Sequence, residues 1–204
     1  FSVPSIIAGN GVILKHAPNV QGCALRIEAS FSEAGFPKNL FQNIIVSSKR
    51  VSDIIKNPKI AAVTLTGSTL AGKSVAETSG SVLKKTVLEL GGSDPYVILE
   101  DADIEKSINS CIDGRLLNAG QSCISAKRLI VVDKLYDRFL ASLKGKLSKK
   151  IMGDPKDDVD LGPMVSIEAR EKVHNQVLKS IKNGANLILG GKIPEMRGAY
   201  YPIT

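Results

Sequence analysis

Glu89-Leu90-Gly91-Gly92 and Asn118-Ala119-Gly120-Gln121-Ser122-Cys123 are the two segments around which this chain of 204 residues is organised. They carry a carboxylate and a thiol, each among glycines, which let a ligand approach the backbone closely. A thiol reacts as a thiolate, and a covalent intermediate needs a base that activates water. Neither segment is diagnostic alone, but together they fit a site that combines a nucleophilic thiol with a base.

Composition indicates an ordinary soluble globular protein of one or two domains, with 43% hydrophobic and 23% charged residues. No apolar run reaches the roughly 18 residues of a membrane-spanning helix, so we expect no membrane association. The apolar start, Phe1 to Leu14, contains Pro4 and lacks a basic region, so it does not resemble a signal peptide.

Three cysteines without metal-binding spacing predict no metal site and fit a reducing cytosol, so we expect a cytoplasmic protein. The net charge of +7 comes from dispersed basic residues. The densest group lies at the end of a predicted helix, where cations complement the helix dipole; it comprises Lys144, Lys146, Lys149 and Lys150. Few aromatic residues accompany it, so we expect no nucleic-acid partner.

The first half alternates strands with helices, which predicts βαβ units, a parallel sheet and part of a doubly wound nucleotide-binding domain. The predicted strands are residues 11–15, 41–46, 60–66 and 86–90. A helix after the first strand carries an apolar stripe, and Cys23 on this stripe is expected to be a core residue.

The pattern shifts after Gly91-Gly92, which is the expected domain boundary, giving domains 1–91 and 92–204. Asp103 and Ser166 are expected to cap two helices. A helix between them is predicted to turn a set of apolar residues inward, Tyr136 among them. Further strands are predicted at residues 96–99, 124–132 and 187–189, with Cys123 at the entrance of the second.

Gly67 to Ser74 also satisfies the P-loop pattern, directly after an apolar strand. This alternative would make the chain a nucleotide triphosphatase, with Lys73 binding phosphate. It leaves Glu89 and Cys123 unexplained. A strand-to-helix turn at Gly67-Ser68 favours an anionic phosphate in either case, and a turn with a purely structural role is the remaining possibility.

The two opening segments resemble the signature segments of the aldehyde dehydrogenase superfamily, and their spacing agrees with it. Further similarities lie in Ala8–Lys15, Thr66–Ser68 and Gly162–Met164, so the resemblance covers essentially the whole chain. Residues 15–20 and 91–95 are most similar to semialdehyde dehydrogenases of the succinate-semialdehyde type.

The resemblance implies an α/β fold: residues 1–91 as the end of a Rossmann-like, doubly wound NAD(P)-binding domain, and residues 92–204 as most of the catalytic domain. It implies that Cys123 attacks a small aldehyde to give a thiohemiacetal and then, after hydride transfer to NAD or NADP, a thioester. Glu89 would activate the water that hydrolyses this thioester.

The resemblance also implies a set of cofactor-binding residues. Lys15 would bind the adenosine ribose, Pro18 stands where NAD-specific relatives often carry a glutamate that repels a 2′-phosphate, and Leu90 would lie beside the nicotinamide. The expected cofactor-binding residues are Lys15, Pro18, Gly67, Ser68, Gly72 and Leu90. Gly120 and Gln121 would shape the turn that presents the thiol.

The sequence departs from the family at one position that concerns the substrate. Many succinate-semialdehyde dehydrogenases place a carboxylate-binding arginine where this chain has Leu117, and the nearest arginine is Arg115. The resemblance implies that the family's asparagine oxyanion donor lies upstream of Phe1 and that a ribose-binding glutamate lies beyond Thr204. We therefore expect a central part of a longer enzyme, weak or inactive alone, that pairs with the missing segments or forms a homo-oligomer. A non-catalytic remnant with this fold is the alternative.

Overall fold

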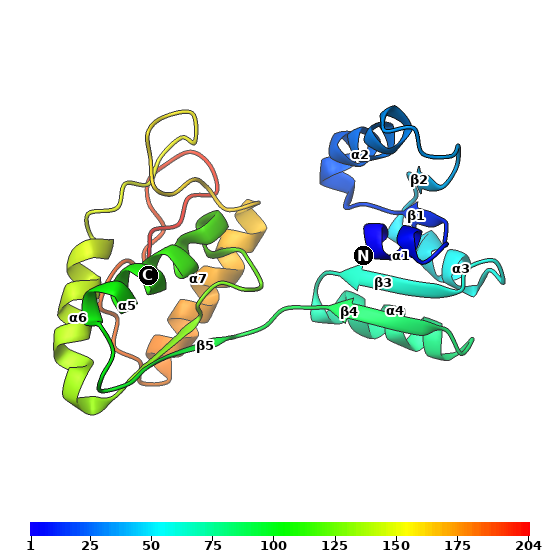
Figure 1. The fold of residues 1–204 in the computed structure, drawn as a ribbon. Helices are drawn as coiled ribbons and strands as arrows, with labels where there is room; N and C mark the ends of the chain where they lie inside the picture. Colours follow the sequence, from blue (N-terminus) through cyan, green and yellow to red (C-terminus); the bar gives the residue numbers. More distant parts are fainter. The chain divides into compact units, whose positions relative to one another are not determined.

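The computed structural model describes residues 1–204, which form two compact units, Phe1–Gly91 and Gly92–Thr204. Figure 1 shows the helices and strands of each unit. The division falls between the two glycines of the first signature segment. None of the helices combines the length and the apolar character that crossing a membrane requires.

The first unit contains two pairs of parallel strands, each joined through a helix, as the alternating sequence pattern predicts. β1 (Val12–Leu14) pairs with β2 (Phe41–Asn43), and β3 (Ala62–Thr66) pairs with β4 (Lys85–Glu89). The helices are α1 (Ser2–Ile7), η1 (Pro18–Val20), α2 (Gln21–Glu33), η2 (Ser48–Arg50), α3 (Val51–Lys56) and α4 (Thr69–Gly80). The α2 helix contacts β2, and α4 packs against β3 and β4 (Figure 1).

The predicted burial of Cys23 is wrong, because the thiol is exposed. The face of α2 that is buried is narrower than the apolar stripe suggests: Ala24 is fully buried, and the Phe31 ring stacks on Phe41 of β2 at 4.5 Å between centroids. Cys23 precedes Ala24, so it lies about 100° around the helix from the buried residue.

A lysine in the segment between α4 and β4 bonds to the C-terminal end of α3. Lys84 Nζ donates to the backbone carbonyl oxygens of Ile55 (2.6 Å) and Asn57 (2.5 Å). Ile55 and Ser79 are buried beside this connection. Charge-assisted hydrogen bonds to carbonyls are stronger than neutral ones. Lys84 therefore connects the C-terminal end of α3 firmly to the segment between α4 and β4.

The second unit contains one parallel pair, β5 (Pro95–Ile98) with β6 (Arg128–Val131). The helices are α5 (Ile104–Leu116), η3 (Leu117–Gly120), α6 (Asp133–Leu147) and α7 (Ile167–Lys182). The two predicted caps are confirmed: Asp103 accepts from the Lys106 N–H and Ser166 from the Ala169 N–H. The core is made of Ile98, Ile104, Ile108, Cys111, Ile112 and Phe139. Burial raises the pKa of the Cys111 thiol, as expected of a structural cysteine.

Three predictions in this unit are wrong. β6 begins at Arg128 rather than at Ile124, so a turn rather than a strand entrance carries Cys123. Residues 187–189 form no strand, because they have no ladder partner. Tyr136 is half exposed, because the buried face of α6 runs through Leu135 and Phe139 instead.

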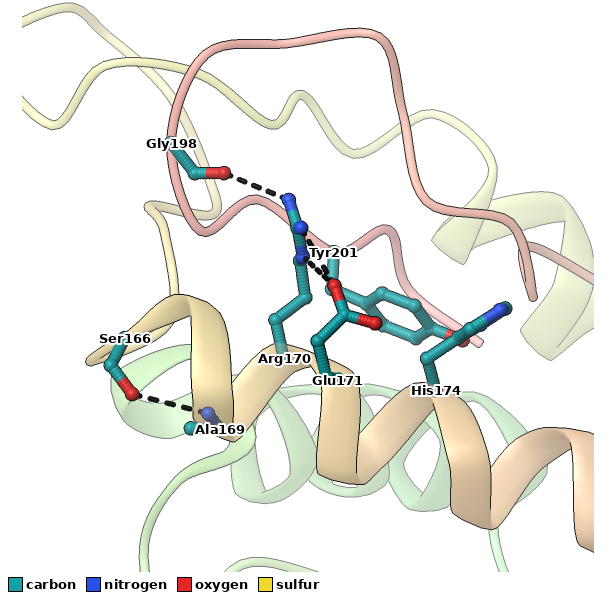
Figure 2. A network of polar contacts seen from close by, with 7 residues as sticks. All are labelled: Ser166, Ala169, Arg170, Glu171, His174, Gly198 and Tyr201. Carbon is teal, nitrogen blue, oxygen red and sulfur yellow. Dashed lines mark hydrogen bonds and ion pairs between the residues drawn. The ribbon is translucent and has the colours of Figure 1, made fainter.

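Side chains of α7 hold the irregular C-terminal segment (Figure 2). Arg170 Nη1 donates to the Gly198 carbonyl oxygen at 2.9 Å, and His174 Nδ1 lies 3.0 Å from the Tyr201 hydroxyl. Tyr201 is buried, which raises the pKa of its hydroxyl. The Met164 N–H also donates to the Ala199 carbonyl, so the segment is anchored on both sides of the start of α7.

Truncation at the centre of the second core should cost far more stability than truncation at its surface. Ile108 is 0% exposed, so Ile108→Ala should lower the free energy of unfolding by about 2–5 kcal/mol. Val97 is 59% exposed, and Val97→Ala should change it by less than about 1 kcal/mol. Chemical unfolding of the whole chain followed by circular dichroism measures both, and equal losses would contradict the placement of the core.

Candidate active site

The carboxyl ends of β3 and β4 bring the first set of site residues together. Thr66 is the register partner of Glu89, and the Gly67 N–H donates to the Glu89 carbonyl oxygen at 2.9 Å. The turn that starts α4 therefore lies beside Glu89 and Leu90. The carboxyl edge of a parallel sheet is where open α/β folds bind their ligands. The Glu89 side chain is exposed at this edge.

The start of α4 offers backbone donors to an anion. Ser68 Oγ accepts from the Ala71 N–H at 3.2 Å, and the Gly72 N–H donates to the Ser68 carbonyl at 2.9 Å. The N–H groups of Thr69 and Leu70 make no hydrogen bond within the chain. Two free donors and the positive end of a helix dipole suit a phosphate group. The expected contacts of Gly67 and Ser68 with a cofactor stay predictions.

The helix geometry argues against the P-loop alternative. A P-loop wraps its backbone N–H groups around phosphate before the helix begins. Here α4 already begins at Thr69, and the Gly72 N–H is engaged by Ser68. Lys73 is an exposed residue inside the helix. The P-loop sequence pattern is present, but the loop whose N–H groups would surround a phosphate is absent, because residues 69–74 already belong to a helix.

Gly72 is buried beneath the side chain of Leu90. A Cβ added to Gly72 would lie 2.6 Å from both terminal methyl groups of Leu90, far inside van der Waals contact. The absence of a side chain at position 72 thus lets Leu90 lie over α4. The structure gives Gly72 a packing role, and its expected contact with a cofactor stays a prediction.

Lys15 and Pro18 follow β1, which belongs to the other strand pair of the first unit. Lys15 Nζ donates to the His16 carbonyl oxygen at 3.0 Å, and Pro18 is the first residue of η1. Their backbone location, after the carboxyl end of a parallel strand, is compatible with ligand binding. Their expected contacts with a ribose and a 2′-phosphate stay predictions.

The thiol segment starts with a rare backbone conformation. Asn118, Ala119 and Gly120 are three successive residues with positive φ, at 52°, 54° and 74°. This conformation costs a non-glycine residue energy, and alanine lacks the side-chain hydrogen bond that offsets it in asparagine. Arg115 Nη1 donates to the Gly120 carbonyl at 3.1 Å and holds the end of the run.

Gln121 fixes the turn on both of its sides. Its Nε2 donates to the Asn118 carbonyl at 3.2 Å, and its Oε1 accepts from the Val165 N–H at 2.9 Å. The expectation that Gln121 shapes the turn is therefore confirmed. The turn is attached to the segment that leads into α7.

Lys127 completes the segment, and sequence reasoning missed it. Its Nζ donates to the carbonyl oxygens of Ser122 (3.1 Å), Cys123 (2.7 Å) and Ser125 (3.3 Å). The Cys123 thiol is exposed, and the Cys123 N–H makes no hydrogen bond within the chain. The only signal in the sequence was a lysine four positions after the cysteine, in a segment that was assigned to a strand.

Leu117 stands at the position where an arginine that binds the substrate is expected, and this apolar side chain is 51% exposed. Arg115, the nearest arginine, is engaged with the Gly120 carbonyl. Loss of solvent lowers the pKa of Arg115 from its ordinary value, but an arginine remains protonated at neutral pH. In this conformation its cation supports the turn.

Comparison with known proteins adds the following findings. The family described as "Aldehyde dehydrogenase family" matches residues 2–204. A succinate semialdehyde dehydrogenase of Escherichia coli (strain K12), named for NAD(P)+, is 44% identical over 204 residues. A succinate-semialdehyde dehydrogenase of Mycobacterium leprae (strain TN), named for NADP+, is 41% identical over 205 residues. Each alignment covers the whole chain and 44% or 45% of the relative, so the chain spans less than half the length of these relatives.

Solved structures agree with this match. The succinic semialdehyde dehydrogenase of Streptococcus pyogenes, in a complex with NADP+, has a TM-score of 0.94 and 39% identity. The match covers 98% of this chain and 44% of that one. A lactaldehyde dehydrogenase follows with a TM-score of 0.93 and 31% identity, over 98% and 43% of the two chains. The α/β architecture described above is therefore that of a part of these enzymes.

The close approach of Gly72 and Leu90 can be tested within one helix. Gly72→Ala and Gly80→Ala both replace a glycine of α4, but a Cβ on Gly80 meets nothing within 4 Å. Gly72→Ala should therefore be less stable than Gly80→Ala by about 1–3 kcal/mol, the usual cost of overpacking. Chemical unfolding measures the difference. Adding Leu90→Ala to Gly72→Ala should remove most of it, and an unchanged difference would contradict the contact.

Proposed function

The chain belongs to the aldehyde dehydrogenase family, and from this premise we propose that it oxidises an aldehyde to a carboxylic acid with NAD(P)+. The observation that carries the proposal is the exposed thiol of Cys123, whose own backbone N–H is free, in a turn held by side-chain hydrogen bonds. Earlier in the chain, Glu89 lies beside the start of α4, where free N–H groups suit an anion. A semialdehyde is the proposed substrate class, because relatives that align with the whole chain are named for succinate semialdehyde.

The first unit, residues 1–91, is proposed to bind the cofactor. The free N–H groups at the start of α4 would hold its phosphates, next to Gly67 and Ser68. Lys15 would bind the ribose hydroxyls, and no acidic residue lies between Lys15 and Ile27 to repel a 2′-phosphate, so NADP+ is accepted as well as NAD+. When bound, the nicotinamide ring accepts the hydride of the oxidation.

The second unit, residues 92–204, is proposed to supply the nucleophile of the covalent steps, and Glu89, at the end of the first unit, is proposed to supply the base. Cys123 Sγ attacks the aldehyde carbon, and the Cys123 N–H donates to the oxygen on which negative charge develops. Loss of hydride from this carbon leaves a thioester on Cys123. Glu89 then takes a proton from water as the water attacks the thioester, and the acid leaves while the thiol is regenerated. The three free cysteines also suit the proposed location in the reducing cytosol, where the Cys123 thiol stays reduced.

A non-catalytic remnant is the second candidate, and one observation favours it. Leu117 occupies the expected place of a substrate-binding arginine, and Arg115 is engaged in the turn. A bound carboxylate needs a cation with suitable geometry. A remnant would bind the cofactor at α4 but would not turn over a semialdehyde.

Nicotinamide reduction by the purified chain distinguishes the two candidates. With succinate semialdehyde and either NAD+ or NADP+, we expect absorbance at the reduced nicotinamide band to rise slowly, because the chain spans less than half the length of its relatives. Cys123→Ala should lower the rate by about a thousandfold or more, because it removes the nucleophile. The cofactor dissociation constant should stay within about twofold, since α4 lies in the other unit.

Undiminished turnover in Cys123→Ala would contradict the assignment of the nucleophile. Cofactor binding without turnover in the parent chain would favour an incomplete enzyme or the remnant. Neither binding nor turnover would overturn the proposal as a whole.

Replacement of Glu89 should separate the two covalent steps. Glu89→Gln keeps the size of the side chain but removes the base, so hydrolysis should slow by about 10²–10⁴-fold while the thioester still forms. Mass spectrometry of the intact protein after mixing with aldehyde and cofactor should show an added acyl group on Cys123. An unmodified mass at normal turnover would count against Glu89 as the base.

A further inference from the structure

The segment that carries Cys123 lacks regular structure, yet one side chain engages its backbone at three points. Residues 121–127 lie between η3 and β6. The Lys127 ammonium has three N–H donors, and the three carbonyls of Ser122, Cys123 and Ser125 lie within 3.3 Å of it. The donor capacity of this side chain is therefore filled by the loop alone.

The hydrogen bond from Lys127 to the Ser122 carbonyl oxygen also fixes the direction of the Cys123 N–H. A peptide group is planar and trans, so its C=O and the N–H of the next residue point in opposite directions. The Ser122 carbonyl shares its plane with the Cys123 N–H. By holding the Ser122 oxygen at 3.1 Å, Lys127 directs the Cys123 N–H to the opposite side.

The bond to the Cys123 carbonyl, at 2.7 Å, fixes the next peptide plane in the same way. The two planes on either side of the Cys123 α-carbon are thus both held by one ammonium, and this determines where the side chain of Cys123 starts. Hydrogen bonds from a charged donor are stronger than neutral ones.

We propose that Lys127 is a positioning residue that sets the direction of the Cys123 N–H, and so builds the backbone part of the oxyanion site. This inference rests on the proposed role of Cys123 as nucleophile. Lys127 contacts backbone atoms of the loop, so it acts through Cys123.

Two reactions of the Cys123 thiol distinguish an effect of Lys127 on the oxyanion site from an effect on the reactivity of the thiol. Iodoacetamide alkylates a thiolate by displacing iodide, and no oxyanion forms. p-Nitrophenyl acetate transfers its acetyl group to Sγ: the S–C bond forms, the ester C–O bond breaks and p-nitrophenolate leaves, through an intermediate whose oxyanion needs a donor. A lost oxyanion donor slows only the acylation, whereas a less reactive thiol slows both reactions.

The variants are Lys127→Met, which removes the donors at similar length, and Lys127→Arg, which keeps the charge but spreads its donors over a planar fork. Lys84→Met is the matched control, because Lys84 is also a lysine bonded to backbone carbonyls, in the other unit. Exposed Cys23 provides an internal reference for alkylation in every variant.

We expect Lys127→Met to lower the ratio of acylation to alkylation at Cys123 about tenfold, less than the 10²–10³ of a fully removed oxyanion donor. Lys127→Arg should restore part of this ratio, and Lys84→Met should leave it within twofold of the parent. A ratio in Lys127→Met within twofold of the parent would overturn the proposal.

A parent chain in which Cys123 takes up no acetyl group would contradict the proposed function instead. Hydrogen exchange then decides on Lys127 alone. The Ser125 and Ala126 amides, which donate to the Ser122 and Gly114 carbonyls, should exchange at least tenfold faster in Lys127→Met than in Lys84→Met. Equal exchange would exclude any role for Lys127 in holding the loop.

Discussion

The hydrogen bond from the Gly67 N–H to the Glu89 carbonyl is the interaction on which the cofactor half of the site depends. It continues the parallel ladder of β3 and β4 past the last paired residues, Thr66 and Glu89. The start of α4 is thereby fixed next to the proposed base, although the two are far apart in sequence. Ser68 caps the helix at this point and leaves the first two N–H groups free. This one hydrogen bond thus places the proposed anion-binding turn next to the backbone of Glu89.

The thiol half is built by a different principle. No ladder reaches Cys123, and the preceding run of positive φ at Asn118, Ala119 and Gly120 is costly by itself. Side chains compensate: Arg115 holds the Gly120 carbonyl, Gln121 ties the turn to Val165, and Lys127 holds the carbonyls around the thiol. The positive φ of Asn118 and Ala119, which is costly for residues with a Cβ, persists because the surrounding contacts determine it. This arrangement leaves the Cys123 N–H free.

Local signals decided how much of this could be predicted. Helix caps at Asp103 and Ser166, and the parallel pairing, follow from side-chain chemistry and periodicity, and they were predicted correctly. The start of β6 was not, because Ile124 and Ala126 alternate with polar residues as in a strand, while the N–H groups of Ser125 and Ala126 donate to the Ser122 and Gly114 carbonyls instead of to a ladder. A lysine that bonds backbone oxygens has no sequence signature. The P-loop pattern shows the converse, since its letters occur where a helix has already begun.

The proposed thiol site and the proposed cofactor site lie in different units, so a loss of function can be traced to one unit or the other. Acylation of Cys123 needs the thiol, its own N–H and the loop that orients it, and these residues all belong to the second unit. The proposed binding of the cofactor phosphates uses the start of α4, which belongs to the first unit. A defect in one assay with the other intact therefore identifies the unit at fault, which overall turnover alone cannot do. In the proposed mechanism, hydride transfer and hydrolysis of the thioester each require residues of both units, because the cofactor and Glu89 are assigned to the first unit and Cys123 to the second. Full turnover therefore reports on the two units acting together, whereas acylation of Cys123 and binding of the cofactor each report on one.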